Sequence, residues 1–252
     1  GQSMEVKDRE DKDIRQPDLK SMNMEELRNW VTGAGQPAFR AKQIYQWFHV
    51  KLADGTEEMT NLPKSLREKM DEYGIYGVSV VTRLISEDDG TNKFLFRLHD
   101  GNVIESVLMK YKHGNSVCIS SQVGCRMGCH FCASTIAGYV RDLMPSELLL
   151  QIYETQRDAG CRIDSIVLMG IGEPLDNFEN VVQFFRILSH PDGMQMSLRH
   201  VALSTCGLVP RIRQLADLRL GVTLSVSLHS PENRHRSEIM PINRRYPVEE
   251  LL

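Results

Sequence analysis

Residues 117–132 read VCISSQVGCRMGCHFC, and they are the most informative part of the chain about its fold. The first five of them predict a strand, and the remainder spaces three cysteines as C-x3-C-x2-C. Two glycines in the loop let the backbone pass close to an inorganic centre. A strand that ends in such a loop is typical of a ligand site at the carboxyl edge of a parallel sheet.

Three thiolates at this spacing favour a reactive metal centre. Structural zinc normally takes four ligands, whereas a reactive centre keeps one coordination position open. A 4Fe–4S cluster bound by Cys125, Cys129 and Cys132 leaves one iron free for a substrate. The alternative is a zinc site completed by Cys118 or His130. The loop by itself leaves both interpretations open.

Strands and helices alternate on the carboxyl side of this loop. The pattern predicts helices over 145–157, 177–188 and 209–218, and strands over 165–169, 200–204 and 222–228. Such alternation is typical of βα units on a parallel sheet or barrel, which binds ligands where its strands end. Three strand ends carry small or polar residues: 170–175, 204–207 and 225–229. Each alone fits an ordinary turn or cap, but together we expect them to line one small-molecule pocket.

Three shorter parts precede the loop. Residues 1–20 hold 11 charged side chains and no aromatic one, which predicts a solvated, disordered tail. Residues 21–74 predict a small helical domain, with helices over 23–33, 39–50 and 63–74 and a capping box formed by Asn23 and Glu26. Residues 75–112 predict a short antiparallel β layer. The βα body then occupies residues 113–252.

Composition limits the kinds of partner. The 252 residues carry a net charge of −3, so any nucleic-acid surface has to be local. Residues 234–245 are one candidate, because they hold four arginines and one glutamate, although a merely solvated face has the same pattern. A weaker basic signal comes from four side chains of the helical domain: Arg40, Lys42, Lys51 and Lys64.

The cysteines, the apolar segments and the first residues of the chain bear on the cellular compartment. No apolar run reaches the ~18 residues of a membrane span, and the first residues show no secretory signal. Clustered cysteines in such a chain suit a reducing, cytoplasmic setting. Cys161 and Cys206 lie among apolar residues, and we expect both to be small buried hydrophobes.

Together, these motifs resemble the RlmN/Cfr family of radical S-adenosylmethionine (SAM) RNA adenine methyltransferases. The matching strings are CISSQVGC at 118–125, GIGEPL at 170–175, LSTCG at 203–207, SLH at 227–229 and IMPIN at 239–243. The resemblance extends from about residue 20 to residue 252 and includes the helical domain. A small departure is Cys206, where many members carry serine. The resemblance implies a partial (βα) barrel of the radical SAM type.

The resemblance also implies a cofactor pocket. The three loop cysteines would hold one 4Fe–4S cluster per chain, and its open iron would bind the amine and carboxylate of SAM. The rest of SAM would contact residues at the strand ends: Gly172, Glu173, Ser204, Ser227, Leu228 and His229.

A route of methyl transfer follows from the same resemblance. One SAM methylates a cysteine of the enzyme, and a second yields a radical that activates this methyl group for addition to carbon 2 of an adenine. Glu105 matches the family's proton acceptor, and Cys118 matches the thiol that releases the product through a disulfide. From the residues alone, a solvent-facing strand glutamate and a buried strand cysteine are the alternatives.

The implied substrates are 23S rRNA and tRNA, and the implied electron donor is of the flavodoxin type. We expect a monomer. Two other functions stay open from the sequence: methylation at carbon 8, as in the Cfr branch, and a zinc-stabilised RNA-binding module without catalysis.

The methyl-carrying cysteine of the family falls beyond Leu252 in this comparison. Only four βα strands are recognisable, and the fourth is expected to be an open hydrophobic edge. We therefore expect these 252 residues alone to bind a cluster but not to methylate RNA.

Overall fold

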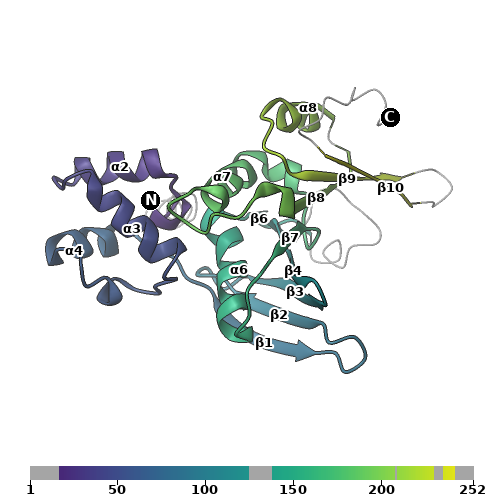
Figure 1. Ribbon diagram of the computed structural model, residues 1–252, viewed down its shortest axis with the longest axis horizontal. Coiled ribbons are helices and arrows are strands. Elements are labelled where there is room, and N and C mark those ends of the chain that lie inside the picture. Colours follow the sequence, from purple (N-terminus) through teal and green to yellow (C-terminus); the bar gives the residue numbers. More distant parts are fainter. Residues whose placement is uncertain (1–16, 125–137, 208, 230–234, 242–252) are drawn as a thin grey trace, which may run out of the picture.

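One eight-stranded sheet forms the centre of the molecule (Figure 1). The computed structural model describes residues 17–124, 138–207, 209–229 and 235–241. The strand order is β1-β2-β3-β4-β7-β8-β9-β10. The strands are β1 (Ser79–Ile85), β2 (Asn92–Arg97), β3 (Val103–Tyr111), β4 (Gly114–Ile119), β7 (Ser165–Leu168), β8 (Val201–Thr205), β9 (Thr223–His229) and β10 (His235–Pro241).

The four central strands β4, β7, β8 and β9 run parallel, which confirms the expected βα body. The antiparallel strands β1 to β3 extend the same sheet, since β3 pairs directly with β4. The expectation of an open edge at the fourth parallel strand was wrong. Strand β10 pairs antiparallel with β9, from His235 opposite His229 to Pro241 opposite Thr223. Within the basic run at 234–245, which also holds the IMPIN motif, residues His235–Pro241 form this edge strand.

Two helices cover one face of the sheet. They are α6 (Pro145–Ala159) and α7 (Phe178–Ser189), and Figure 1 shows them between the sheet and the N-terminal helices. Side chains alternate along a strand, so every second residue faces the helices. On β2 and β3 these residues include Phe94, Phe96 and Ser106, and the Ser106 hydroxyl donates to Gln151 on α6 at 2.8 Å. Neither α6 nor α7 covers the opposite face of the parallel strands, the uncovered face, whose residues include Cys118.

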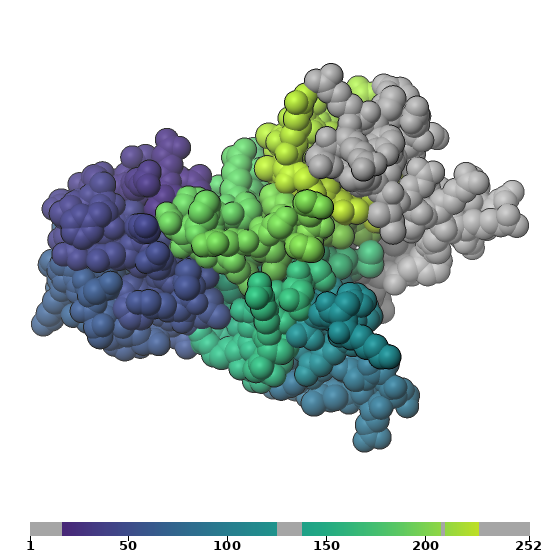
Figure 2. Space-filling view, viewed as in Figure 1, coloured from purple at the N-terminus to yellow at the C-terminus, as the bar shows by residue number. Residues whose placement is uncertain are grey.

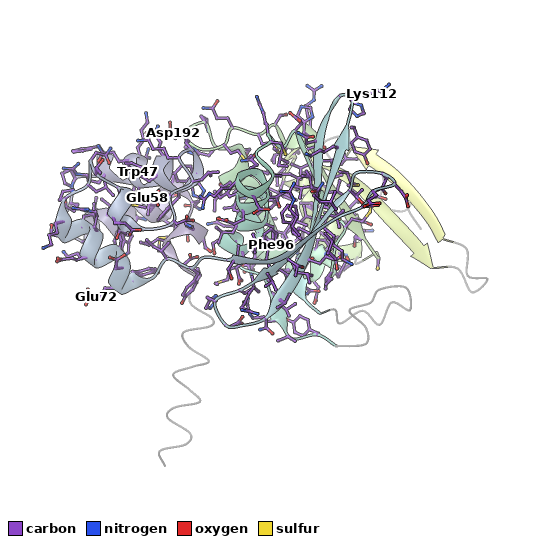
Figure 3. The ribbon with its side chains drawn as sticks, turned by 90° about the horizontal axis from the view of Figure 1, so that it is seen from below. Trp47, Glu58, Glu72, Phe96, Lys112 and Asp192 are labelled. Atoms are coloured by element: carbon purple, nitrogen blue, oxygen red, sulfur yellow. The ribbon has the colours of Figure 1, made fainter. Side chains whose placement is uncertain are left out.

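The N-terminal helices form a lobe at one end of the molecule (Figure 2). They are α2 (Met24–Gly33), α3 (Phe39–His49) and α4 (Lys64–Tyr73), accompanied by short 3₁₀ turns at Leu19–Ser21 and Thr56–Glu58. The predicted capping box at the start of α2 is confirmed, because the Asn23 side chain accepts from Glu26 N and Glu26 accepts from Asn23 N. Figure 3 shows Trp47, Glu58 and Glu72 on this lobe, and Lys112 on the β3–β4 hairpin.

Buried polar contacts join the lobe to the βα body. The Tyr45 hydroxyl donates to the carbonyl of Ile187 at 3.0 Å, and His49 Nδ1 lies 2.7 Å from the Tyr153 hydroxyl. One continuous hydrophobic core runs through both parts. None of the described helices combines the length and the hydrophobicity of a membrane-spanning segment.

The expected solvated tail ends earlier than the sequence suggested. Asp18, Leu19 and Lys20 are only 1%, 0% and 3% exposed, so residues 18–20 belong to the folded part of the chain. The Asp18 carboxylate accepts from Tyr76 N at 2.9 Å, and Ser146 N donates to Ser21 Oγ at 3.0 Å. The charge pattern of residues 1–20 does not predict these contacts, because the partner residues lie far away in the chain. Residues 1–16 lie outside the described part.

The remaining elements lie near the loop or between the βα strands. The two-residue strands β5 (Gln122–Val123) and β6 (Arg141–Asp142) pair with each other. A 3₁₀ turn at Pro174–Asn177 precedes α7, another at Leu198–His200 precedes β8, and α8 (Val209–Asp217) follows β8. Cys161 and Cys206 are half-buried rather than fully buried, as both lie near the ends of elements.

Candidate functional site

The uncovered face of the sheet brings several predicted residues together. In the register of the strands, Val107 on β3 lies opposite Cys118 on β4, and Cys118 lies opposite Val167 on β7. Glu105 is two residues before Val107 and therefore points to the same side as Cys118. Ser204 on β8 also alternates onto this side and is half-buried. The face thus joins the predicted acid–base residue, the predicted thiol and one predicted SAM contact.

The turn after β7 lies against the segment that leads into the cysteine loop. Ser121 N donates to the carbonyl of Ile171 at 2.9 Å, and Gly170 N donates to the carbonyl of Ile119 at 3.1 Å. Gly172 has a φ of +108°, and a Cβ built there would lie 2.7 Å from Gln122 N. Only glycine fits this close approach without displacing the neighbouring backbone.

Glu173 is the buried carboxylate of the site, with 2% of its surface exposed. Its side chain accepts from the Thr205 hydroxyl and, at 3.4 Å, from Cys206 N. Burial raises the pKa of Glu173 from its ordinary 4.5 to about 7, and the bonds from Thr205 and Cys206 oppose this rise only in part. A carboxylate in such surroundings is well suited to receive a cation from a ligand.

The two ends of the cysteine loop are held side by side. Strands β5 and β6 pair before and after it, and Val140 N donates to the carbonyl of Val123 at 2.7 Å. A Cβ built on Gly124 would lie 1.7 Å from the carbonyl oxygen of Gly138, so the neck of the loop requires glycine at 124. The cysteines themselves, Cys125, Cys129 and Cys132, lie outside the described residues.

The Cys118 thiol lies on the uncovered face within the influence of the Glu105 charge. Burial raises the pKa of the Cys118 thiol above its ordinary value, a hydrogen bond with the Met169 backbone opposes this, and the charge of Glu105 adds to the rise. The Glu105 carboxylate also pairs with Lys93 Nζ at 3.2 Å, and both side chains are partly exposed. The thiol is therefore kept protonated, and the carboxylate stays accessible.

Two residues of the site, Gln122 and Thr205, were not predicted from the sequence. Gln122 and Thr205 both belong to the quoted motifs, but their roles depend on contacts with Glu173 from distant parts of the chain. Hydroxyl and amide side chains at strand ends were the available signal. Ser227, Leu228 and His229 lie at the end of β9, and their side chains are outside the described part of the structure.

Two family models match the chain. The model of the ribosomal RNA large subunit methyltransferase N-terminal domain matches residues 17–75, which contain the helical lobe. The model of the radical SAM superfamily matches residues 119–252, which contain the cysteine loop and most of the parallel strands. Together they account for the lobe and for the βα body.

Individual relatives match both parts at once. A probable dual-specificity RNA methyltransferase RlmN of Lachnospira eligens is 52% identical over 93% of this chain and 67% of its own length. A relative of the same name in Clostridium novyi is 48% identical over 92% of this chain and 68% of its own length. The crystal structure of a radical SAM methyltransferase from Sphaerobacter thermophilus superposes with a TM-score of 0.79 at 38% identity, covering 94% and 70% of the two chains. This chain thus spans about two thirds of the length of the curated relatives.

Proposed function

Because this chain belongs to the RlmN family of radical SAM RNA methyltransferases, we propose that the protein methylates carbon 2 of an adenine in 23S rRNA and in tRNA. The observation that carries the proposal is the 52% identity to a dual-specificity RNA methyltransferase across 93% of the chain. Carbon 2 is a poor nucleophile, so ordinary polar methyl transfer fails there and radical addition is needed. The target adenine has to leave its stack, because stacking hides this carbon.

The cofactors of this function are a 4Fe–4S cluster and SAM. We assign the cluster to Cys125, Cys129 and Cys132, since the described ends of their loop lie at the carboxyl edge of β4 beside the turn that carries Glu173. This placement fits a cluster whose open iron faces the SAM pocket. When bound, the cluster and SAM supply the radical that an unreactive aromatic carbon requires.

Glu173 is the residue we assign to the SAM ammonium group. The bonds that its carboxylate accepts from Thr205 and Cys206 come from neutral groups, a hydroxyl and a backbone N–H. A ligand cation beside this buried carboxylate would lower its raised pKa and keep it ionised. We assign the remaining SAM contacts to Gly172 and Ser204 and to the end of β9: Ser227, Leu228 and His229.

Glu105 and Cys118 are assigned to the release of product. Glu105 would accept the proton that carbon 2 of the adduct loses. The Cys118 thiol would then attack the sulfur of the methyl-carrying cysteine, so that an S–S bond forms, the C–S bond to the base breaks, and the thiol proton passes to the released methyl group. The common face of the two residues and the partly exposed carboxylate support these roles. The raised pKa of the thiol is consistent with a group that stays protonated and unreactive until it is needed.

RNA contact is assigned to the helical domain at 21–74 and to the basic run at 234–245. Arginine and lysine side chains bind the phosphate oxygens of RNA well. Both regions belong to the same chain as the residues assigned to catalysis. We further propose a monomer that receives electrons from a flavodoxin-type donor.

Two other functions are less well supported. Methylation at carbon 8 is the activity of the Cfr branch, whereas the relatives described above carry the RlmN name. A zinc-stabilised RNA-binding module would not explain the match of residues 119–252 to the radical SAM superfamily.

The function is tested with the complete gene product, whether this chain is the whole of it or a part. After anaerobic reconstitution, we expect iron and sulfide at about four each per chain. After incubation with SAM, a reductant and unmodified RNA, mass spectrometry of nucleosides should show 2-methyladenosine in both 23S rRNA and tRNA. Finding 8-methyladenosine instead would assign the protein to the other branch, and zinc in place of iron would refute the proposal.

The ligand assignment has its own test. Replacing Cys125 with Ala should remove the cluster and all reductive cleavage of SAM, because two thiolates do not hold it. Cys161→Ala is the matched control, since Cys161 is a half-buried cysteine far from the loop in sequence. Cleavage that persists in Cys125→Ala at the level of this control contradicts the assignment.

A further inference from the structure

One buried amide connects three segments of the site. Gln122 is 0% exposed. Its Nε2 donates to Asp142 Oδ1 and to Asp176 Oδ2, each at 2.8 Å, and its Oε1 accepts from Glu173 N at 2.9 Å. Asp142 lies in the segment that follows the cysteine loop. Glu173 and Asp176 lie in the turn that follows β7, the Glu173 turn. Both amide hydrogens and one acceptor position are therefore used in joining the segments.

The two hydrogen bonds that Gln122 donates are stronger than bonds between two neutral side chains. Both donors of Gln122 meet carboxylate oxygens, and charge-assisted hydrogen bonds are roughly twice as strong as neutral ones. Inside the protein, a donor or acceptor that loses its partner costs about 1–3 kcal/mol, so the arrangement resists partial opening. The Tyr139 hydroxyl lies 3.1 Å from the same Asp142 oxygen and adds a further contact from the loop side.

We infer that Gln122 is a positioning residue that fixes the Glu173 turn relative to the neck of the cysteine loop, and so fixes the distance between the cluster and the ammonium-binding carboxylate. Within the described residues, the Gln122 amide bonds to Asp142, Asp176 and the Glu173 backbone N–H rather than to the Glu173 carboxylate. SAM has to bind to the cluster and to Glu173 at once, so a loosened joint weakens binding even when both ends are intact. The inference rests on the proposed function of Glu173.

A first test does not involve SAM. In the cluster-free chain, hydrogen exchange of residues 171–176 reports whether the turn is held. Gln122→Met keeps a similar volume and removes all three bonds, so exchange of Glu173 N should accelerate by about tenfold or more. Gln183→Met is the matched control, because Gln183 also joins two segments through its amide, by bonds to Ser21 and Asn23 in the lobe. Unchanged exchange in Gln122→Met overturns the inference.

A second test measures SAM binding by the reconstituted protein. We expect the Kd for SAM to rise at least about tenfold in Gln122→Met and less than about twofold in the control, with iron and sulfide retained. An unchanged Kd with a full cluster overturns the inference. If wild-type protein with a full cluster does not bind SAM, the proposed function fails, whereas the exchange result still tests the joint.

If Gln122→Met does not fold, a pair of substitutions that together keep the net charge tests the same inference. Gln122→Glu puts a third carboxylate beside Asp142 and Asp176 and should weaken SAM binding at least about tenfold. Adding Asp142→Asn restores a donor–acceptor pair in the reverse direction and the original net charge. We expect the double variant to recover at least about fivefold in Kd over Gln122→Glu, and no recovery counts against a hydrogen-bonded joint.

Discussion

The chemistry of this site depends on individual side chains whose surroundings differ from water. Glu173 is buried and held by neutral donors, so it is only partly ionised near neutral pH until a cation arrives. Cys118 is kept as a thiol by burial and by the nearby Glu105 charge. Both effects follow from the cost of charge in a poorly solvated place, and both can be measured without the cofactors.

The stability of the cluster-free chain should depend on Glu173 in a defined pH range. The unfolded glutamate titrates near 4.5 and the folded one near 7, so the folded state binds more protons between these values. The free energy of unfolding therefore falls as pH rises from about 4.5 to about 7. Glu173→Gln removes this slope, which gives the variant an advantage of up to about 3 kcal/mol above pH 7.

Urea unfolding at several pH values measures this difference. Glu179→Gln is the control, because Glu179 is exposed on α7 and lacks the burial that drives the effect. Parallel stability curves for wild type and Glu173→Gln would contradict the assigned environment of the carboxylate.

Alkylation of Cys118 tests its coupling to Glu105. Because the pKa of the thiol is raised, we expect slow reaction with iodoacetamide near neutral pH and acceleration in alkaline solution. Glu105→Gln removes a negative charge and should shift this acceleration to lower pH. Site-resolved mass spectrometry follows the rate, and Cys161 in the same sample serves as the internal reference. Identical profiles for Cys118 in both proteins would mean that the two groups do not interact.

At the scale of elements, the site is an arrangement of strand ends and turns. The Glu173 turn is bonded along its length to the segment that follows β4, and the two pass so closely that Gly172 has no space for a side chain. A turn held this way presents Glu173 in one orientation. The glycine is thus a requirement of the contact between two elements, as well as of its own backbone angle.

Gly172→Ala separates these two requirements. Its methyl group would lie 2.7 Å from Gln122 N and its φ is +108°, so we expect a loss of about 2–4 kcal/mol in the free energy of unfolding. Gly101 has a φ of +88° with nothing within 4 Å, so Gly101→Ala should cost only about 1 kcal/mol. Urea unfolding compares the two variants, and equal losses would exclude a specific close approach at Gly172.

At the scale of the whole molecule, the helical lobe and the βα body share a core. Contacts such as His49 with Tyr153 are buried, and the hydrophobic residues of both parts form one continuous cluster. A lobe attached in this way holds the proposed RNA-contacting residues at a constant position relative to the proposed catalytic residues. This rigidity is what a large, shaped RNA substrate requires.

Cooperative unfolding is the expected consequence of this shared core. The chain has two tryptophans, Trp30 and Trp47, and both lie in the lobe, so their fluorescence reports on it alone. Far-ultraviolet circular dichroism reports on the whole chain. We expect the two signals to change at the same urea concentration, as they do in a single cooperative transition. Loss of the fluorescence signal at lower urea would show that the lobe unfolds independently.

The sequence predicted the elements well where the signal is local. The capping box of α2, the βα alternation and the strand-end motifs come from neighbouring residues, and the structure has helices and strands at those positions. It failed where the partner is distant. The docking of residues 18–20 and the pairing of β10 with β9 both depend on contacts that no local pattern contains.

The kind of chemistry can be predicted from the amino-acid sequence, because the cysteine spacing, the glycine-rich turn and the order of motifs are properties of consecutive residues. How these groups act depends on the folded structure. The raised pKa of Glu173, the placement of Glu105 and Cys118 on one face of neighbouring strands and the bridging role of Gln122 arise from burial and register. Residues such as Gln122 and Glu173 are far apart in the chain, so desolvation and hydrogen bonding between them exist only after folding.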